Sequence, residues 1–410
     1  MTMKWGKIFA FLFAGLLIAG FTAQASAEAT QKHTLTILVS IDGFRADYLD
    51  RGITPALSAL AEGGVKASVR PSYPSVTFPN HYTLITGKTP NQHGLVANLF
   101  DNKEYGVRFS LMDPAGARNP VFWTGAKPIW ASAEEQGKVT AHMFWPAIGV
   151  DSAQKPPKHF QPFIPGTDVL DEPQMLIDLL GSIGEPVDFA TLYFYDLDSA
   201  GHKYGPNSVE VNQTLKRLDA AIARLVEGLK KSNLWQTTNL VITSDHGMTD
   251  SPVGNLVLLD ELLPPDQFEA VGLYTNATIR PANGTPLKEL AAKLVGRHDH
   301  MECWLREEMP ARYHYGSNEN IEPIVCLADP GWLIVTKEIA ADIKEKGSHG
   351  YDPSLKDMAA VFIATGPAFK SNIQLEPFDN VDIYPLLARL IGIEGEPGDG
   401  NLSALQKTLK

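Results

Sequence analysis

Short apolar segments alternate along the chain with segments that have helical spacing. The runs Leu35–Ile41 and Leu240–Thr243 are continuous and short, which is typical of buried strands. Helical patterns separate such runs, so the chain is not a succession of hairpins. This alternation predicts an α/β fold whose central sheet is mostly parallel and is flanked by helices.

The clearest helical pattern lies beyond Asn207. Apolar residues recur there at alternating steps of four and three and form one stripe: Val211, Leu215, Leu218, Ile222, Leu225 and Leu229. Such a stripe predicts a helix that packs on the core and carries no chemistry. A shorter helix is expected from Pro55, with Thr54 as its N-cap, to Gly63 and Gly64.

Aspartate and histidine residues stand where strands are expected to end. Asp42 follows the first strand, and Asp245 and His246 follow Leu240–Thr243. Gly247 comes next and would allow a tight turn. In an open parallel sheet, ligands gather at the carboxyl ends of the strands. These residues are therefore candidate metal ligands.

Two further segments repeat this arrangement. The stretch "FATLYFYDLDSAGH" supplies Asp198 and His202, and "KGSHGYD" supplies His349 just before the strand-like "AAVFIATGPAF". Gly201 and Gly205 should break any helix, which places Asp198 and His202 on a loop. Three aspartates and three histidines in such places suit two divalent metal ions.

Residues 251–340 are expected to form a small α/β insertion that caps the site. This stretch contains strand-like "GLYTNATIRP", helix-like "PLKELAAKLVG" and strand-like "GWLIVTKE". An insertion between two ligands costs little if its ends lie close together. The cluster His298, Asp299 and His300 lies inside it and is interpreted as polar residues at the surface that do not bind metal.

The segment "PSYPSVTFPNHYTLITG" is too apolar for a solvent loop, although three prolines interrupt it. A helix can continue after Pro79 and end at Gly87, which places Thr77 at a helix amino terminus. Exposed N–H groups and the helix dipole favour an anion there. A hydroxyl beside a divalent metal at that position can act as a nucleophile. The alternative is that Thr77 is only an N-cap.

Composition and charge exclude some classes of protein. The chain is 44% hydrophobic and 20% charged, as in an ordinary globular protein. The net charge is −12 and the basic residues are not clustered, so a nucleic-acid polymer is not an expected partner. No protein partner is indicated either, and a small-molecule substrate is expected.

The amino terminus has the pattern of a secretory signal peptide over residues 1–27. Lys4 and Lys7 precede the apolar "IFAFLFAGLLIAGF", and Ala25-Ser26-Ala27 matches a cleavage site. The mature chain would then be periplasmic or secreted, without a membrane span; the alternative is an uncleaved anchor. In an oxidising compartment, Cys303 and Cys326 could form a disulfide, and the alternative is two buried free thiols.

Several separated motifs together resemble the nucleotide pyrophosphatase/phosphodiesterase family of the alkaline phosphatase superfamily. They are "SIDGFR", "PSVTFPNHYTLITGKTPNQHGLVAN", "MFWP", "DLDSAGHKYGP", "ITSDHGM", "GSHGYD" and "FIATGPAFK". The likeness runs in order from about residue 34 to residue 392. It implies a catalytic alkaline phosphatase-like domain formed by residues 28–250 and 341–410.

The resemblance also implies a role for each matching residue. Asp42, Thr77, Asp245 and His246 would hold one zinc ion, and a second would be held by Asp198, His202 and His349. Thr77 would be the nucleophile that forms a phospho-threonine intermediate, and Asn98 would hydrogen-bond a phosphate oxygen. Phe78 and Tyr193 match aromatic positions that sandwich a nucleobase, although Tyr193 could equally belong to the core.

The expected activity is hydrolysis of nucleotide phosphodiesters or pyrophosphates with release of a nucleoside monophosphate. A sulfatase is disfavoured because Thr77-Phe78-Pro79-Asn80 lacks the arginine which that chemistry needs. A phosphomonoesterase is disfavoured because no arginine neighbours Thr77 to pair with a dianion. A choline- or glycerophospholipid-type phosphodiesterase with the same metal core remains open, as does a non-catalytic metal-binding relative.

Overall fold

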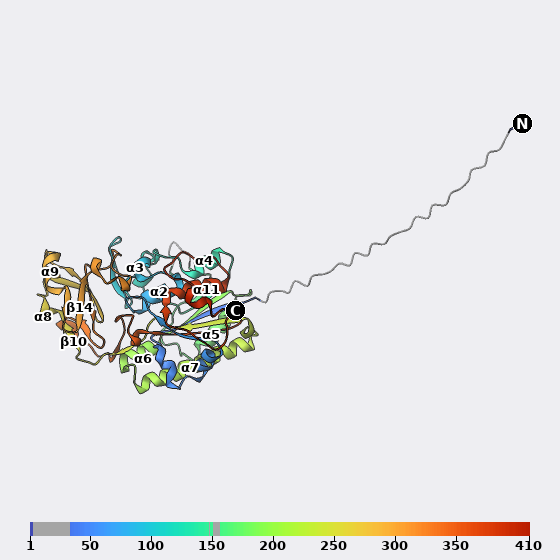
Figure 1. Ribbon diagram of the computed structural model, residues 1–410, viewed down its shortest axis with the longest axis horizontal. Coiled ribbons are helices and arrows are strands. Elements are labelled where there is room, and N and C mark those ends of the chain that lie inside the picture. Colours follow the sequence, from blue (N-terminus) through green and yellow to red (C-terminus); the bar gives the residue numbers. More distant parts are fainter. Residues whose placement is uncertain (3–32, 147, 151–155) are drawn as a thin grey trace. The chain divides into compact units, whose positions relative to one another are not determined.

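A nine-stranded sheet forms the centre of the structure, a computed structural model that describes residues 1–2, 33–146, 148–150 and 156–410 (Figure 1). The strand order is β19-β2-β18-β8-β1-β7-β5-β6, and β20 pairs with β2. The predicted signal peptide and its cleavage site lie outside the described residues. The bounds are β1 (Leu35–Ile41), β2 (Val65–Arg70), β5 (Thr140–Met143), β6 (His159–Gln161), β7 (Phe189–Phe194), β8 (Thr238–Thr243), β18 (Ala360–Thr365), β19 (Ile373–Gln374) and β20 (Phe378–Asp379).

Most neighbouring strands of this sheet run parallel. β1 lies parallel to β7 on one side and to β8 on the other, and β5 continues the parallel part between β7 and β6. β18 is antiparallel to β8 and β2. Every residue of β1, β7 and β8 is buried, which is expected for strands that are covered on both faces. The predicted α/β class with a mostly parallel sheet is confirmed.

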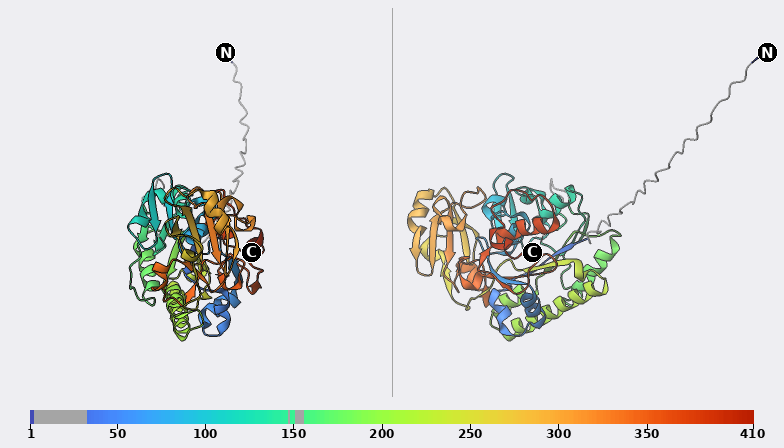
Figure 2. Two further views of the ribbon diagram at one scale, coloured as in Figure 1. Left: turned by 90° about the vertical axis from the view of Figure 1, so that its left-hand side faces the viewer. Right: turned by 45° about the vertical axis from the view of Figure 1, so that its right-hand side comes forward.

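Helices cover both faces of the sheet (Figures 1 and 2). One face carries α2 (Thr77–Thr86), α3 (Pro90–His93), α4 (Ile129–Glu135) and α11 (Ile383–Ile391). The other carries α5 (Glu172–Ser182), α6 (Asp196–Tyr204) and α7 (Val209–Lys231). All six predicted stripe residues of α7 are fully buried, so the prediction of a core-packing helix is confirmed.

The helix α1 (Pro55–Gly63) has the predicted bounds, but its amino end is stabilised in an unexpected way. Thr54 occupies the N-cap position without a side-chain cap hydrogen bond. The carboxylate of Asp219, on α7, instead accepts hydrogen bonds from the amides of Ala56 and Leu57, at 3.1 and 2.8 Å. A carboxylate from a distant helix thus satisfies the free N–H groups and the positive end of the helix dipole.

A second, five-stranded sheet lies within the predicted insertion and has its own hydrophobic cluster. Its order is β11-β12-β15-β14-β13, and a two-stranded pair, β10 with β16, adjoins it. Cys303 on β14 and Cys326 on β15 face each other and are joined by a disulfide, as predicted. The bounds are β10 (Leu256–Leu258), α8 (Leu259–Leu262), β11 (Phe268–Gly272), β12 (Asn276–Pro281), α9 (Leu287–Leu294), β13 (Gly296–His298), β14 (Met301–Leu305), β15 (Ile324–Ala328), β16 (Leu333–Val335) and α10 (Lys337–Ala340).

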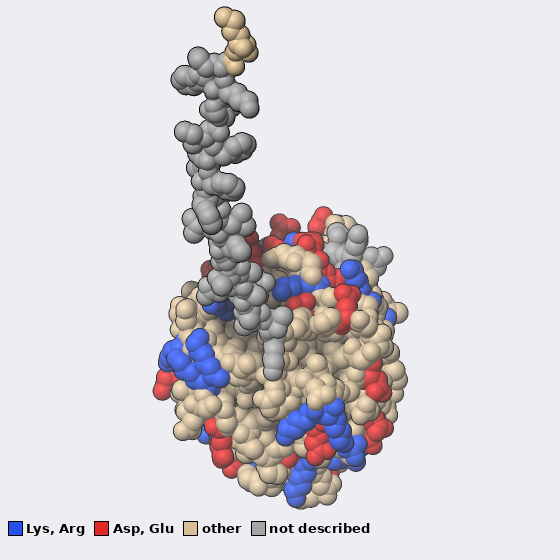
Figure 3. All heavy atoms as spheres, turned by 90° about the vertical axis from the view of Figure 1, so that its right-hand side faces the viewer, with Lys and Arg blue, Asp and Glu red and all other residues tan. Residues whose placement is uncertain are grey.

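The remaining elements are small. A hairpin of β3 (Leu99–Asn102) and β4 (Val107–Ser110) follows α3, β9 (Thr249–Asp250) pairs with β17 (Gly347–Ser348), and α12 (Ser403–Gln406) lies near the carboxyl end. No helix in the described part of the chain has the length and apolarity needed to cross a membrane. On the face shown in Figure 3, lysine and arginine are interspersed with aspartate and glutamate. The described residues of that face therefore form no large patch of positive or of negative charge.

Candidate active site

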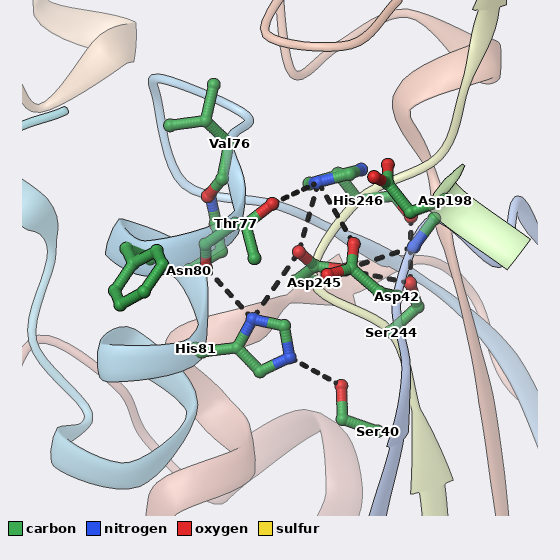
Figure 4. A network of polar contacts seen from close by, with 12 residues as sticks. Ser40, Asp42, Val76, Thr77, Asn80, His81, Asp198, Ser244, Asp245 and His246 are labelled. Carbon is green, nitrogen blue, oxygen red and sulfur yellow. Dashed lines mark hydrogen bonds and ion pairs between the residues drawn. The ribbon is translucent and has the colours of Figure 1, made fainter. Parts of the chain in front are cut away.

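The carboxyl ends of β1, β7 and β8 bring the predicted ligands together. In the sheet register, Ser40 of β1 lies opposite Tyr193 of β7 and Thr243 of β8. The three strands therefore end at the same level, and the segments that follow them meet. Asp42 follows β1, Asp245 and His246 follow β8, and Asp198 lies just beyond β7 (Figure 4).

Asp198 and His202 lie on one face of α6, so the predicted loop is wrong. They are four residues apart on the helix, and His202 Nε2 is 3.4 Å from Asp198 Oδ2. Gly201 is not a helix breaker here but a site of close packing. A Cβ atom on it would lie 2.8 Å from the terminal methyl of Met248. The helix ends before Gly205, whose φ of 89° is a backbone conformation that glycine adopts easily and other residues rarely do.

Gly247 is also needed for packing rather than for the predicted turn geometry. Its φ is not positive, but an added Cβ would lie 2.0 Å from the carbonyl oxygen of Asp357. Only glycine lets the segment after His246 pass so close to the neighbouring backbone. The segment that carries His246 is thus fixed against the chain before β18.

One ligand group surrounds His246 Nε2 (Figure 4). This nitrogen is 3.0 Å from Asp245 Oδ2, 3.5 Å from Asp42 Oδ1 and 3.3 Å from the Thr77 hydroxyl. Asp42, Asp245 and His246 are almost fully buried. The structure therefore brings together all four residues that the resemblance assigned to the first metal.

The second ligand group lies beside the first. His349, in the loop after β17, places its Nε2 3.1 Å from His202 Nε2 and 3.6 Å from Asp198 Oδ1. The ring of His349 stacks on that of His246 with centroids 3.6 Å apart. The groups Asp198, His202 and His349, and Asp42, Asp198 and His246, each have the spacing needed to hold one ion. Neither group includes the cluster His298, Asp299 and His300.

The hydrogen bonds of the three ligand histidines fix their tautomers. The Nδ1 atoms of His202, His246 and His349 each lie 2.9 Å from a backbone carbonyl oxygen, of Gly347, Gly247 and Ser75 respectively. A carbonyl can only accept, so each Nδ1 carries the proton and each Nε2 presents a lone pair to the cluster. This arrangement is typical of histidines that bind metal through Nε2.

The cluster has the unpaired acceptors that a cation requires. One carboxylate oxygen on each of Asp42, Asp198 and Asp245 is buried without a hydrogen-bond partner. Burial, with Asp245 and Asp198 nearby, raises the pKa of Asp42 well above its usual value. Burial and the neighbouring histidines lower the pKa of His349 well below its usual value. Buried carboxylates that lie close together, and imidazoles kept neutral by burial, are the groups that bind divalent cations such as zinc.

Thr77 is the first residue of α2, as predicted, and Val76 occupies the N-cap position. Its hydroxyl therefore lies at the positive end of the helix dipole and beside the first ligand group. Asn98 approaches the same helix end, where its side-chain oxygen accepts a hydrogen bond of 3.0 Å from the amide of Phe78. That contact occupies the amide oxygen, so the NH₂ group of Asn98 is left to donate to a bound ligand.

Comparison of the sequence and the structure with known proteins identifies the family of this chain. Residues 36–352 match the family model described as type I phosphodiesterase / nucleotide pyrophosphatase. The chain belongs to that family. Human ectonucleotide pyrophosphatase/phosphodiesterase family member 5 is 34% identical over 400 residues, which cover 97% of this chain and 83% of the human protein. Bis(5'-adenosyl)-triphosphatase enpp4 of Xenopus laevis is 34% identical over 369 residues, 90% of this chain and 80% of its own.

Solved structures of family members have the same fold. The structure of the human member 5 matches with a TM-score of 0.87 and 35% identity, and covers 92% of this chain and 99% of its own. An inactive variant of the murine member 5, solved in complex with AMP, also matches with a TM-score of 0.87, at 31% identity, over 92% of this chain and 100% of its own. The central sheet and the flanking helices are therefore those of the phosphodiesterase family.

The two aromatic residues predicted to sandwich a base lie in different environments. Phe78 is partly exposed and lines a small cavity of about 30 Å³ together with Trp123, Trp130 and Trp145. Tyr193 is only 8% exposed, and its hydroxyl donates a hydrogen bond of 2.6 Å to Asp42 Oδ2. Stacking on a base requires an open ring face, so the geometry favours for Tyr193 a role in orienting Asp42.

The prediction from sequence missed His81, which lies beside the candidate ligands. His81 lies one helical turn after Thr77 and is 1% exposed. Together with Asp42 and Asp245 it forms a third group with spacing suited to a metal. Its position four residues after the candidate nucleophile, on the same helix, is a signal that could have identified it.

Proposed function

We propose that the protein is an exported two-zinc phosphodiesterase that cleaves nucleotide phosphodiesters or pyrophosphates and releases a nucleoside monophosphate. The observation that carries the proposal is the position of the Thr77 hydroxyl, 3.3 Å from His246 Nε2 at the amino end of α2. A non-catalytic metal protein would have no use for a hydroxyl in that place, beside two open ligand groups. Membership of the phosphodiesterase family supports the same reaction class.

Two sets of side chains would hold the zinc ions. Asp42, Thr77, Asp245 and His246 form one, and Asp198, His202 and His349 form the other. When bound, two such ions supply Lewis-acid stabilisation for the attacking and departing oxygens of a phosphoryl transfer. The Nδ1 hydrogen bonds to backbone carbonyls keep the three imidazoles in the tautomer and orientation which this binding requires.

The chain's own groups divide the reaction between them. Thr77 Oγ1 attacks phosphorus as its proton is lost, and the bond to the alcohol or phosphate leaving group breaks on the opposite side, with that proton going overall to the leaving group. This leaves a phospho-threonine whose phosphate still carries the nucleoside. Water then cleaves the Thr77–phosphate bond and regenerates the hydroxyl. Charge on the non-bridging oxygens is stabilised by the NH₂ group of Asn98 and by the positive end of the α2 dipole.

The aromatic pocket around Phe78 supports a nucleotide as substrate. Phe78 is partly exposed beside the nucleophile and offers an apolar ring on which an aromatic base can stack, whereas Trp123, Trp130 and Trp145, which line the same small cavity, are buried. The Xenopus relative is named for cleavage of a bis-adenosyl triphosphate, and the murine one was solved with AMP. A choline- or lipid-type phosphodiesterase would share the metal core and differ only in this pocket.

Replacement of the nucleophile tests the proposed reaction. Thr77→Ala should abolish turnover of a nucleotide p-nitrophenyl ester but still bind about two zinc ions, because the three other ligands of the first set remain. The matched control is Thr86→Val at the far end of the same helix, whose hydroxyl donates to the Tyr82 carbonyl and accepts from the Lys88 amide. Wild-type enzyme quenched during turnover should carry a nucleoside monophosphate esterified to Thr77. A substantial residual rate in Thr77→Ala, or fewer than two zinc ions in active protein, contradicts the proposal.

The substrate class is tested with a second variant. Phe78→Ala should lower kcat/KM on the nucleotide p-nitrophenyl ester by about one to two orders of magnitude, since stacking contributes roughly 1–3 kcal/mol per base. Its rate on bis-p-nitrophenyl phosphate should change much less, and phosphomonoesters should be poor substrates for the wild type. Equal loss on both diesters would favour the choline or lipid alternative.

A further inference from the structure

His81 links three elements that meet at the active site. It lies on α2, and its ring packs edge-on against Tyr193 of β7 and against Trp145, with centroids 5.0 and 5.2 Å apart. One ring nitrogen faces the start of α2 and Asp245, which follows β8, and the other faces Ser40 on β1 (Figure 4). The side chain is 1% exposed, so these contacts alone determine its orientation.

The contacts of His81 fix where its proton lies. Nδ1 is 2.9 Å from the carbonyl oxygen of Thr77, which can only accept, so Nδ1 carries the proton. The same N–H is 3.4 Å from Asp245 Oδ2. Nε2 must then accept, and its partner is the Ser40 hydroxyl at 2.9 Å. Both nitrogens are thus engaged, and the one that faces the carboxylates presents a proton instead of a lone pair.

This orientation distinguishes His81 from the ligand histidines. His202, His246 and His349 also donate from Nδ1 to a carbonyl, but their Nε2 atoms face the carboxylates of the cluster. His81 has the suitable spacing to Asp42 and Asp245, yet turns a donor toward them. The third metal-like group is therefore not a ligand set.

We propose that His81, supported by Ser40, is a positioning residue that fixes the first turn of α2 relative to Asp245. The N–H at Nδ1 is hydrogen-bonded to the Thr77 carbonyl and lies 3.4 Å from the Asp245 carboxylate of the first zinc set, and Ser40 bonds the ring to the strand that leads to Asp42. The pair thereby sets the nucleophile against its metal site. This inference rests on the proposed function and adds a residue to it that no ligand set contains.

The test compares three variants. His81→Phe removes both hydrogen bonds and keeps a buried ring, and should lower kcat by about 100-fold with KM nearly unchanged, because displacement of a nucleophile by about 1 Å has an effect of this size. Its affinity for the more weakly bound zinc should fall about 10- to 100-fold in chelator competition. His81→Asn keeps an N–H near the position of Nδ1 and should recover at least about tenfold of kcat. Ser40→Ala should lower kcat alone, by about three- to tenfold.

Each outcome decides the matter. Unchanged kcat and zinc affinity in His81→Phe overturn the proposal, as does loss of one zinc from His81→Asn, which would make His81 a ligand. If His81→Phe does not fold, wild-type kcat and zinc affinity in both remaining variants overturn it as well. Zinc competition is measured without turnover, and Thr77→Ala is not involved, so a failure of the proposed reaction remains distinguishable from a failure of this inference.

Discussion

At the scale of single residues, the site is organised by hydrogen bonds that leave one atom of each side chain available. Three histidines give their Nδ1 protons to backbone carbonyls, and three aspartates each keep one buried oxygen without a partner. Tyr193 adds to this order, because its hydroxyl occupies Asp42 Oδ2 and leaves Oδ1 toward His246. The second layer of contacts thus decides which ligand atoms face the metal positions.

Tyr193→Phe removes the hydroxyl and keeps the ring. We expect zinc affinity to fall about 10- to 100-fold, as for other partners of metal ligands, and kcat/KM to fall equally on nucleotide and non-nucleotide diesters. Chelator competition and parallel assays on the two esters measure this. Tyr48→Phe is the control, since it removes another buried hydroxyl, one that has no hydrogen-bond partner. A loss confined to the nucleotide ester would restore the predicted role of Tyr193 in base stacking.

Glu172 is a fully buried carboxyl in the first turn of α5, and neither of its oxygens has a hydrogen-bond partner. Burial, with Asp196 and Asp168 nearby, raises its pKa from the usual 4.5 to about 9. Between these values the folded protein holds a proton that the unfolded chain releases. The free energy of unfolding therefore falls as the pH rises, by up to about 1.4 kcal/mol per pH unit.

Glu172→Gln should remove that dependence. In zinc-free protein, urea unfolding at pH 5, 7 and 9 should give a flatter profile for the variant, which becomes more stable than the wild type above about pH 7. Glu185→Gln, at an exposed glutamate nearby, is the matched control. A constant difference between Glu172→Gln and the wild type across this pH range would mean that Glu172 is not protonated in the folded state.

At the scale of elements, the five-stranded sheet does more than adjoin the site. Thr275, just before β12, donates a hydrogen bond of 2.7 Å to the carbonyl oxygen of His349. Asn276, the first residue of β12, donates to the carbonyl oxygen of Gly350 at 3.3 Å. The loop that carries His349, a proposed ligand of the second zinc ion, is thus held by the residues at the start of β12.

Thr275→Val should loosen this loop while preserving the shape of the side chain. The change removes the bond to the His349 carbonyl and the one that the hydroxyl accepts from Asn276. A loss of about 1 kcal/mol for the bond to the loop should lower the affinity of the second zinc site about fivefold and reduce kcat accordingly. Thr278→Val on the same strand is the control, because its hydroxyl accepts only from the amide of Gly272. Equal zinc affinity in Thr275→Val and the control would show that the loop needs no support from β12.

The elements also show where prediction from sequence succeeded and failed. Strands β1 and β8 and the helix α7 were predicted because burial on both faces, or along one stripe, leaves a direct pattern in the chain. The helix α6 was missed because a glycine such as Gly201 disfavours a helix locally. In the structure, glycine is needed at this position because Met248 packs closely against it, and only the folded chain creates that contact. The contacts of His81 were missed for a similar cause, since Ser40 and Asp245 become its neighbours only when α2 packs on the sheet that contains β1 and β8.

At the scale of the whole molecule, the ligands come from segments far apart in the chain, and the site depends on the sheet that aligns them. Asp42 and His349 are separated by some three hundred residues, and the inserted region lies between His246 and His349. The order of the motifs, together with the parallel strands, could be recognised without the structure. The supporting contacts of Tyr193 and Thr275 could not, because no local pattern records them.

The disulfide gives a prediction at this scale. Cys303 and Cys326 join β14 to β15 in the hydrophobic cluster of the inserted sheet, 23 residues apart. Free-thiol titration of the denatured, unreduced protein should find none. A Cys303→Ala/Cys326→Ala double variant should lose about 3 kcal/mol of stability, because a closed loop of this size restricts the unfolded chain. This change should lower the melting temperature of the inserted region first.

Activity should depend little on that disulfide at temperatures where the variant stays folded. None of the candidate metal-ligand groups includes a residue of this sheet, and its link to His349 passes through Thr275, whereas Cys326 lies opposite Ala277 in the register. The double variant is a better probe than a thiol reductant, because a reductant would also bind zinc. We expect kcat and zinc content of the variant within about twofold of wild type at 25 °C, with thermal inactivation faster. If zinc affinity instead fell as far as in Thr275→Val, the disulfide would be needed to hold the His349 loop in place. The inserted sheet would then support the metal site directly and would not only cap it.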